Sequence, residues 1–141
     1  MSEIGHRDLS GKVIAAAIAV HKALGPGFLE SIYEEALCIE LDAVGLTYER
    51  QRLLPIFYRN KLIGEHRLDL LVREKIIAEQ KAVSAVDDIH FAIVRSYLRA
   101  TDLHDALLLN FAALPLLIKR VGRATNENSI PEIPDFLISR F

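Results

Sequence analysis

The sequence has only one cysteine, Cys38, and no tryptophan among its 141 residues. A single cysteine excludes an internal disulfide, so a disulfide-stapled fold is ruled out and a reducing, cytoplasmic compartment is the simpler expectation. No early apolar run approaches the roughly 20 residues that span a bilayer, because the longest, residues 13–20, has eight. The N-terminal stretch also lacks the basic start and apolar segment of a secretory signal. We therefore expect no membrane segment.

Charge of one sign is not in excess, because 17 Lys and Arg oppose 19 Asp and Glu, a net charge of −2. No global field therefore draws the chain toward nucleic acid. Residues 50–81 are locally basic, with eight Lys or Arg against four Asp or Glu. Such a segment is either a solvated face or a phosphate-binding surface. The chain also lacks a glycine-rich phosphate loop, a histidine pair at metal-binding spacing and a Ser/His/Asp or Cys/His set.

The chain does have enough apolar sequence for one core. Hydrophobic residues make up 51% and charged residues 26%, values typical of a globular domain of this length. We expect a single domain over residues 1–121 and a partly irregular extension over 122–141. The extension ends in the apolar cluster FLISRF, which favours docking on its own domain or on a partner, a homodimer included.

Hydrophobic periodicity divides the chain into helices and strands. The first helix has a clear end, because Gly25 suits the left-handed position after a helix and Pro26 cannot continue one. The spacing predicts helices over 9–24, 27–44 and 87–100, and strands over 47–58, 62–72, 76–83, 104–112 and 114–121.

Three ionisable residues, Asp69, Glu79 and Lys81, lie inside the apolar hairpin RLDLLVREKIIAEQKAV. Burying such charges costs several kcal/mol unless they are paired or bind a cation. Because side chains alternate along a strand, Leu68 and Leu70 are expected together on the face opposite to Asp69. The acid is therefore expected to face away from those leucines.

Counting along the hairpin brings the two acids together. A three-residue turn makes Val72 oppose Ile76, and three steps along each strand this register places Asp69 opposite Glu79, with side-chain roots about 5 Å apart. Two carboxylates this close repel, which raises one pKa unless a positive charge lies between them. Lys81, two residues along on the Glu79 face, or a divalent metal can supply that charge. Alternatively, Lys81 forms a structural ion pair with Glu79, or a register slipped by one residue separates the acids.

A further acid, Glu30, is expected in the first turn of the second helix. It is either an additional member of the site or simply a residue that the helix dipole favours at this position. Its neighbours Glu34 and Glu35 are interpreted as solvated surface.

The run Gly27 to Tyr33, GFLESIY, matches the pattern that names the GxxExxY protein family, and the resemblance continues through RLDLLV, IIAEQKAV, SYLRAT and LLLNFA. It covers roughly residues 12–121. That family is grouped with the PD-(D/E)XK nuclease-like superfamily. The resemblance implies an α/β fold with a restriction-endonuclease-like core, in which helices flank a mixed central sheet of about four to five strands.

The resemblance also implies roles for the charged residues. Asp69 and Glu79 would be the metal ligands, with Mg²⁺ as the ion and Mn²⁺ as an alternative. The backbone carbonyl of Gln80 would complete the site, and Lys81 would orient or polarise the attacking water. Glu30 corresponds to a helix acid that adds a ligand or an outer contact, and we count it among the catalytic candidates.

Substrate contacts are expected from Tyr33, Arg67, Arg95 and Tyr97, with a purely structural role as the alternative for Tyr33. The chain departs from the family pattern at Ile93, where relatives tend to carry Gln four residues before the tyrosine that is Tyr97 here.

The expected function is a Mg²⁺-dependent nuclease that hydrolyses phosphodiester bonds in DNA or RNA. One alternative is a catalytically inactive nuclease fold that acts as a nucleic-acid-binding or protein-interaction module, which Ile93 favours. Another is a metal-dependent hydrolase of small phosphorylated substrates.

Overall fold

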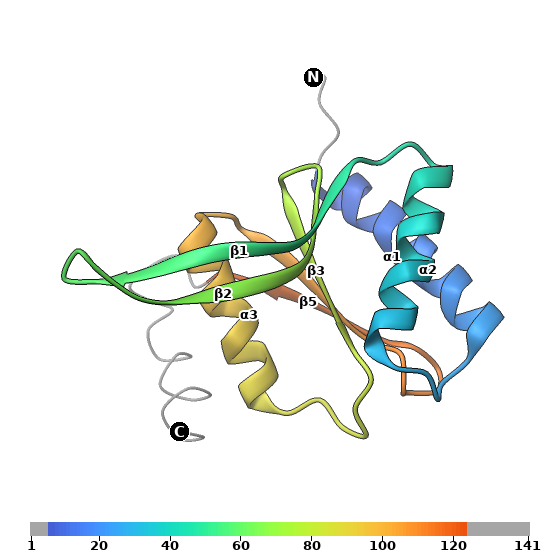
Figure 1. Cartoon of the computed structure of the whole chain (residues 1–141). Helices are drawn as coiled ribbons and strands as arrows, with labels where there is room; N and C mark the ends of the chain where they lie inside the picture. Colours follow the sequence, from blue (N-terminus) through green and yellow to red (C-terminus); the bar gives the residue numbers. More distant parts are fainter. Residues whose placement is uncertain (1–5, 124–141) are drawn as a thin grey trace.

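The computed structural model describes residues 6–123 and shows a sheet with helices on both faces (Figure 1). The extension expected beyond residue 121 lies outside the described residues from position 124 onward, and so does its apolar end. The homodimer that this end suggested has no support among the described residues. No helix of the described part is both long and apolar enough to cross a bilayer. The elements are α1 His6–Leu24, α2 Glu30–Ala43, β1 Tyr48–Tyr58, β2 Lys61–Val72, β3 Ile76–Lys81, α3 Asp88–Thr101, β4 Asp105–Asn110 and β5 Leu117–Gly122.

The strands form one five-stranded sheet in the order β1-β2-β3-β4-β5. Neighbours run antiparallel except β3 and β4, which pair in parallel from Ile76↔Asp105 to Lys81↔Asn110. A parallel pair needs a crossover, and α3 provides it by carrying the chain from the end of β3 back to the start of β4. The predicted mixed α/β sheet with flanking helices is confirmed.

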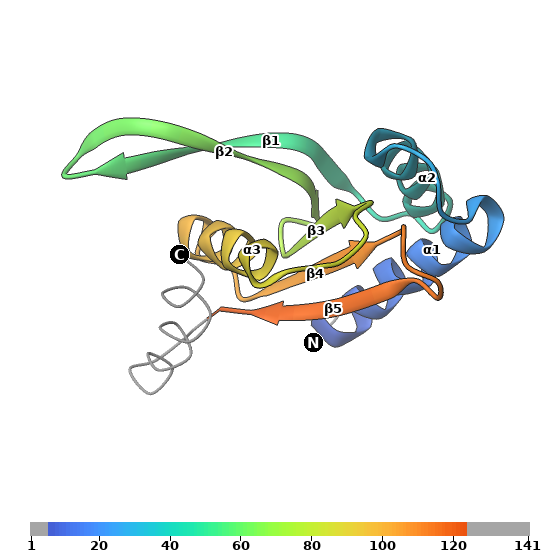
Figure 2. The same ribbon diagram turned by 90° about the horizontal axis from the view of Figure 1, so that it is seen from below.

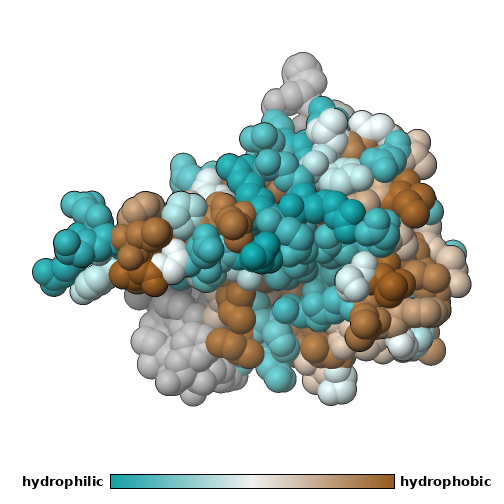
Figure 3. Space-filling view, viewed as in Figure 1, coloured by the Kyte–Doolittle hydropathy of each residue, from teal (hydrophilic) through white to brown (hydrophobic). Residues whose placement is uncertain are grey.

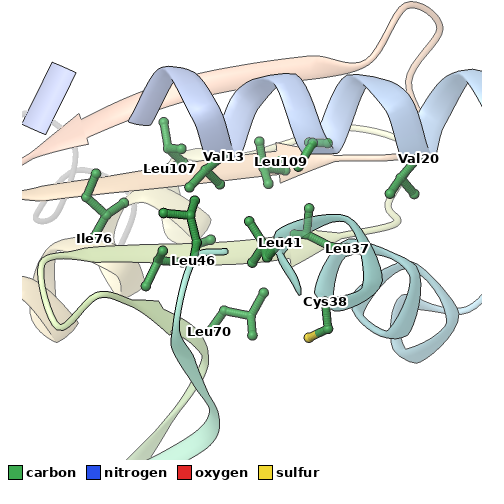
Figure 4. Close-up of a cluster of buried hydrophobic side chains, with 14 of the residues drawn as sticks. Val13, Val20, Leu37, Cys38, Leu41, Leu46, Leu70, Ile76, Leu107 and Leu109 are labelled. Carbon is green, nitrogen blue, oxygen red and sulfur yellow. The ribbon is translucent and has the colours of Figure 1, made fainter. Parts of the chain in front are cut away.

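Two apolar clusters, one on each face of the sheet, hold the helices in place. On the first face α1 and α2 pack on β3 and β4, and side chains such as Val13, Leu41 and Leu107 are almost fully buried (Figure 4). On the second face α3 packs on β4 and β5 through side chains such as Val94 and Leu98 (Figure 2). Each fully buried aliphatic side chain contributes about 1.5–3 kcal/mol to folding. β3 and β4 are covered on both faces, which explains their continuous apolar runs.

The turn between α1 and α2 is held by a buried tyrosine. The hydroxyl of Tyr33 donates to the carbonyl of Gly25 at 2.5 Å and accepts from the backbone N–H of Phe28 at 3.2 Å. Its ring stacks on Phe111, with centroids 4.5 Å apart. The residues just before α2 therefore form this turn. The helix begins at Glu30, three residues later than the periodicity predicts.

The register of the β2–β3 hairpin is the predicted one. Val72 opposes Ile76 and Leu70 opposes Ala78. A register slipped by one residue, the alternative that would have separated the acids, is wrong. Pairing of the two backbones stops at Leu70↔Ala78, so the next position outward, where the acids lie, is free of the regular ladder.

The expectation that Leu68 and Leu70 share a face is wrong. Leu70 belongs to the cluster under α1 and α2, whereas Leu68 belongs to the cluster under α3. The cause lies in the neighbouring strand, where Gln51 has a left-handed backbone with φ of 54° and interrupts the pairing opposite Asp69. This interruption lies between Leu68 and Leu70, at the point where the side chains of β2 change from one cluster to the other.

Candidate active site

Asp69 and Glu79 meet where the β2–β3 ladder ends. The backbone N–H of Gln80 donates to Oδ2 of Asp69 at 3.0 Å, and the backbone N–H of Asp69 donates to Oε1 of Glu79 at 3.4 Å. The two carboxyl groups thus accept hydrogen bonds from the backbone N–H groups at the position where regular pairing of β2 and β3 has ended. The strand bend at Gln51 turns Asp69 toward this position, and the predicted register supplies Glu79.

Burial and mutual repulsion raise the pKa of both acids. Glu79 is only 4% exposed, and burial, followed by the charge of Asp69, raises its pKa to about 8. Burial also raises the pKa of Asp69, to about 6, although the hydrogen bond from Gln80 and the charge of Lys81 act in the opposite direction. Both acids therefore lose their protons at higher pH than exposed carboxyl groups do.

Glu30 approaches the same strand from α2. Its Oε2 accepts a hydrogen bond from the backbone N–H of Ala82, at 3.2 Å, just beyond Lys81 at the end of β3. Together with Asp69, Glu30 lines a depression of about 450 Å³. The described residues that line it are Glu30, Ser31, Glu34, Arg50, Gln51, Asp69 and Gln80. Among residues 6–123, no three His, Cys, Asp or Glu side chains are gathered closely enough to form a ready-made metal cluster.

Glu34 is buried, so its interpretation as solvated surface is wrong. It is 6% exposed, and its carboxylate accepts from Nε of Arg50 at 3.0 Å and from Nε2 of Gln51 at 2.8 Å. Glu35 is exposed, as expected, and binds the outer side of the same arginine. One signal in the sequence was available: Glu34 follows Glu30 by four residues, which places both on one face of the helix.

Tyr97, on α3, lies near the two acids. Burial raises the pKa of its hydroxyl, and so do the nearby charges of Glu79 and Asp69. The ring meets the edge of His66, with centroids 4.7 Å apart. Nε2 of His66 lies 3.1 Å from the hydroxyl of Ser96, and burial lowers the pKa of the imidazole. The sequence offered no signal for His66, because its contact with α3 depends on the strand bend.

The other expected substrate contacts are less closely gathered. Arg67 is exposed on β2, and Arg95 is partly exposed on α3. Tyr33 has no exposed surface, so a substrate contact does not fit its position, and its hydrogen bonds show a structural role in the turn before α2. Ile93 packs against the apolar cluster under α3, where it adds packing and no polar group.

Comparison with protein-family models identifies one superfamily. The sequence model of a family described as the PD-(D/E)XK nuclease superfamily matches residues 7–121. Among solved structures, the chain is similar to one titled "Crystal structure of SSO0001", with a TM-score of 0.54, 17% identity and coverage of 79% of this chain. The match spans 60% of that protein, and at this identity it shows likeness of fold. No curated protein matches.

Proposed function

Since the chain belongs to the PD-(D/E)XK nuclease superfamily, we propose that it hydrolyses phosphodiester bonds in DNA or RNA at Asp69 and Glu79, with a bound Mg²⁺ or Mn²⁺ ion. The observation that carries this proposal is that two carboxyl groups at the end of the β2–β3 ladder each accept a hydrogen bond from the backbone of the opposite strand. Two acids with raised pKa values are unfavourable there by themselves, and a hard cation between them removes that cost.

The donors at this place fit such an ion. Asp69 and Glu79 offer carboxylate oxygens, the backbone carbonyl of Gln80 is the next donor in the chain, and Glu30 reaches the same strand end from α2. An all-oxygen set suits Mg²⁺ or Mn²⁺ better than metals that prefer nitrogen or sulfur ligands. A bound divalent ion supplies charge neutralisation at the scissile phosphate and increased acidity for a water molecule.

The chain's own side chains have separate roles in this proposal. Asp69 is held in one orientation by the Gln80 N–H, so little reorganisation is needed when the ion binds. Lys81 lies near both acids, since its charge lowers the pKa of each, and its ammonium group would orient the attacking water and stabilise charge that develops on the phosphate. Arg95 and Tyr97 would contact the substrate on the α3 side, and Arg67 would contact it from β2.

Calorimetric titration with Mg²⁺ and Mn²⁺ tests the metal site. Wild type should bind one ion in this region, Asp69→Asn should lose binding, and Asp8→Asn, which removes an exposed acid on α1, should bind like wild type. If wild type binds neither ion, the metal site is wrong.

Cleavage assays with single- and double-stranded DNA and RNA test the reaction. Wild type should cleave at least one of the four in the presence of metal, and Lys81→Ala should not. Cleavage that survives Lys81→Ala contradicts the assigned role of this lysine.

A non-catalytic nuclease fold is the second candidate, because Ile93 leaves an apolar side chain where relatives of the resembled family carry an amide. Its signature would be nucleic-acid binding without cleavage of any of the four substrates. Ile93→Gln then provides a direct comparison: gain of cleavage would show that the missing amide is what silences the site.

A further inference from the structure

The β1–β2 hairpin extends far beyond the rest of the sheet. β3 pairs only with residues 70–72 of β2, so the distal part of the hairpin has no third strand. We call residues 55–67 the hairpin arm, and all of its side chains are exposed except Ile56 and His66, which are partly buried. Figures 1 and 2 show it projecting from the body of the molecule. A two-stranded hairpin without other support is marginal in water, so folding alone does not account for its length.

The arm ends in a tight and well-defined tip. Tyr58 pairs with Lys61 across a two-residue turn, in which Arg59 and Asn60 have left-handed φ values of 51° and 66°. This is the turn geometry that matches the natural twist of a hairpin. The guanidinium of Arg59 lies over the Tyr58 ring, 5.5 Å from its centroid, so the cation is presented on an ordered support.

The tip of the arm has a hydrophilic surface, and an apolar band lies next to it, toward the body of the molecule (Figure 3). The arm carries Arg59, Lys61 and Arg67 against a single acid, Glu65, and none of the three cations forms an ion pair with another described residue. Behind the tip, the side chains of Phe57, Tyr58, Leu62 and Ile63 are between 60% and 64% exposed. Contiguous exposed apolar surface beside free cations is characteristic of a binding surface.

The arm is also directly connected to the proposed active site, because β2 runs from the tip to Asp69. Eight residues separate Lys61 from Asp69, a distance of about 26 Å at the rise of an extended strand. That is about eight base pairs of a duplex at 3.4 Å per base pair. A substrate held at both places must keep its shape over this distance, which a duplex does and a single strand does not.

We propose that the hairpin arm binds duplex DNA, with Arg59 and Lys61 on backbone phosphates about eight base pairs from the cleaved bond and the apolar band against base edges. The proposal rests on the proposed nuclease function and names its substrate. The major groove of B-form DNA admits a two-stranded β-ribbon, and thymine methyl groups there accept apolar contacts. The major groove of A-form RNA is too deep and narrow, so duplex RNA is not the expected occupant.

Fluorescence anisotropy in EDTA measures binding without chemistry. The probes are a labelled 20-base-pair DNA duplex, the same sequence as duplex RNA, and the single strand. The test protein carries Arg59→Ser and Lys61→Ser, and the control carries Lys12→Ser and Lys22→Ser, an equal change in charge on exposed residues of α1. Circular dichroism melting confirms that each variant folds.

The tip variant should bind duplex DNA at least tenfold more weakly than wild type at 0.1 M salt, and the slope of log K against log salt should fall by about 1.8, the value for two phosphate contacts. The α1 control should keep the wild-type slope. Phe57→Ala with Leu62→Ala should weaken binding and leave the slope unchanged, because apolar contacts release no counterions.

Equal slopes for the tip variant and wild type, no binding of duplex DNA by wild type, or equally tight tip-dependent binding of duplex RNA would each overturn the assignment. Cleavage assays with metal separate this proposal from the proposed function. Tip-dependent DNA binding without cleavage supports the arm as a DNA-binding element and refutes the nuclease activity. If the tip variant cleaves duplex DNA at the wild-type rate and with the wild-type salt dependence, only the DNA-binding role of the arm is refuted.

Discussion

At the scale of single residues, Asp69 and Glu79 lie together in a largely buried position, where ionised carboxylates are unfavourable. Burial raises the pKa of both Glu79 and Asp69, so the pair holds a proton to higher pH than exposed carboxyl groups do. A cation that enters must displace this proton, and metal binding should therefore become tighter as pH rises.

The first residue-scale prediction concerns stability against pH in the absence of metal. Both folded-state pKa values lie above the values in the unfolded chain, so the pair's contribution is fully present at acid pH and is lost as pH rises through about 6 and 8. The free energy of unfolding should fall between pH 5 and 9 by on the order of 2–4 kcal/mol. Urea unfolding across this range measures it.

Glu79→Gln should remove most of that fall, because a neutral amide does not titrate. Glu65→Gln, on the exposed arm, serves as the matched control and should keep the wild-type slope. A Glu79→Gln profile that still falls like wild type would assign the pH dependence to other groups.

A second residue-scale prediction concerns the tyrosine that holds the turn before α2. Tyr33→Phe keeps the stack on Phe111 and removes both hydrogen bonds of the hydroxyl. The partly buried carbonyl of Gly25 then loses a partner, and the free energy of unfolding should fall by about 1–2 kcal/mol. Tyr58→Phe, at an exposed tyrosine of the arm, should change it little. Chemical denaturation of the three proteins checks this, and an unchanged Tyr33→Phe midpoint would contradict the structural role.

At the scale of elements, α2 is fastened to the sheet close to the site. Glu34 on the second turn of α2 binds Arg50 and Gln51 of β1, and Gln51 is the residue whose backbone bends the strand pair at Asp69. These hydrogen bonds, which we call the clasp, connect the helix that carries Glu30 with β1, the strand that pairs with the Asp69 strand β2.

The prediction at this scale separates Glu34 from its neighbour. Glu34→Ala should lower the free energy of unfolding by about 1–2 kcal/mol, a modest value because Arg50 is partly exposed to solvent. It should also lower kcat about tenfold with little change in KM, because misplaced catalytic groups cost rate more than binding. Glu34→Gln, which keeps an acceptor, should restore part of the rate.

Glu35→Ala provides the matched control. Glu35 binds the same Arg50 from the exposed side, where ion pairs contribute little, and its removal should leave both stability and kcat near wild type. Stopped assays of cleavage and urea unfolding on the same preparations check this. If the Glu34 and Glu35 variants behave alike, the clasp does not position the site.

Much of this element-scale arrangement follows from the sequence, and the exceptions around Asp69 share one cause. Periodicity predicts the helices and strands, and a three-residue turn fixes the register that brings Asp69 toward Glu79. What it misses depends on the backbone of Gln51, because no pattern predicts a left-handed φ at an ordinary glutamine. Leu68, His66 and the burial of Glu34 all follow from that bend or from the clasp beside it.

At the scale of the whole molecule, two separate apolar clusters share one sheet. β3 and β4 supply side chains to both clusters, so loosening one face changes the support of the other. A single cooperative unfolding transition is expected from this arrangement.

The whole-molecule prediction tests that coupling with one truncation on each face. Leu37→Ala on α2 and Leu98→Ala on α3 both truncate fully buried side chains. Each should lower the free energy of unfolding by about 2–5 kcal/mol. Ile39→Ala, at a residue that is 64% exposed, should have little effect. Far-ultraviolet circular dichroism in urea should show one transition for each protein, and a two-step curve for either core variant would show that the faces unfold separately.

The lone thiol makes the hairpin arm accessible to measurement. Cys38 is 3% exposed within the cluster under α2, and burial raises its pKa, so it should react slowly with maleimides in the folded protein. A cysteine introduced by Asn60→Cys at the tip would then be the single reactive position of the chain. A fluorophore attached there would report how far the arm stands from a labelled DNA end during one binding event.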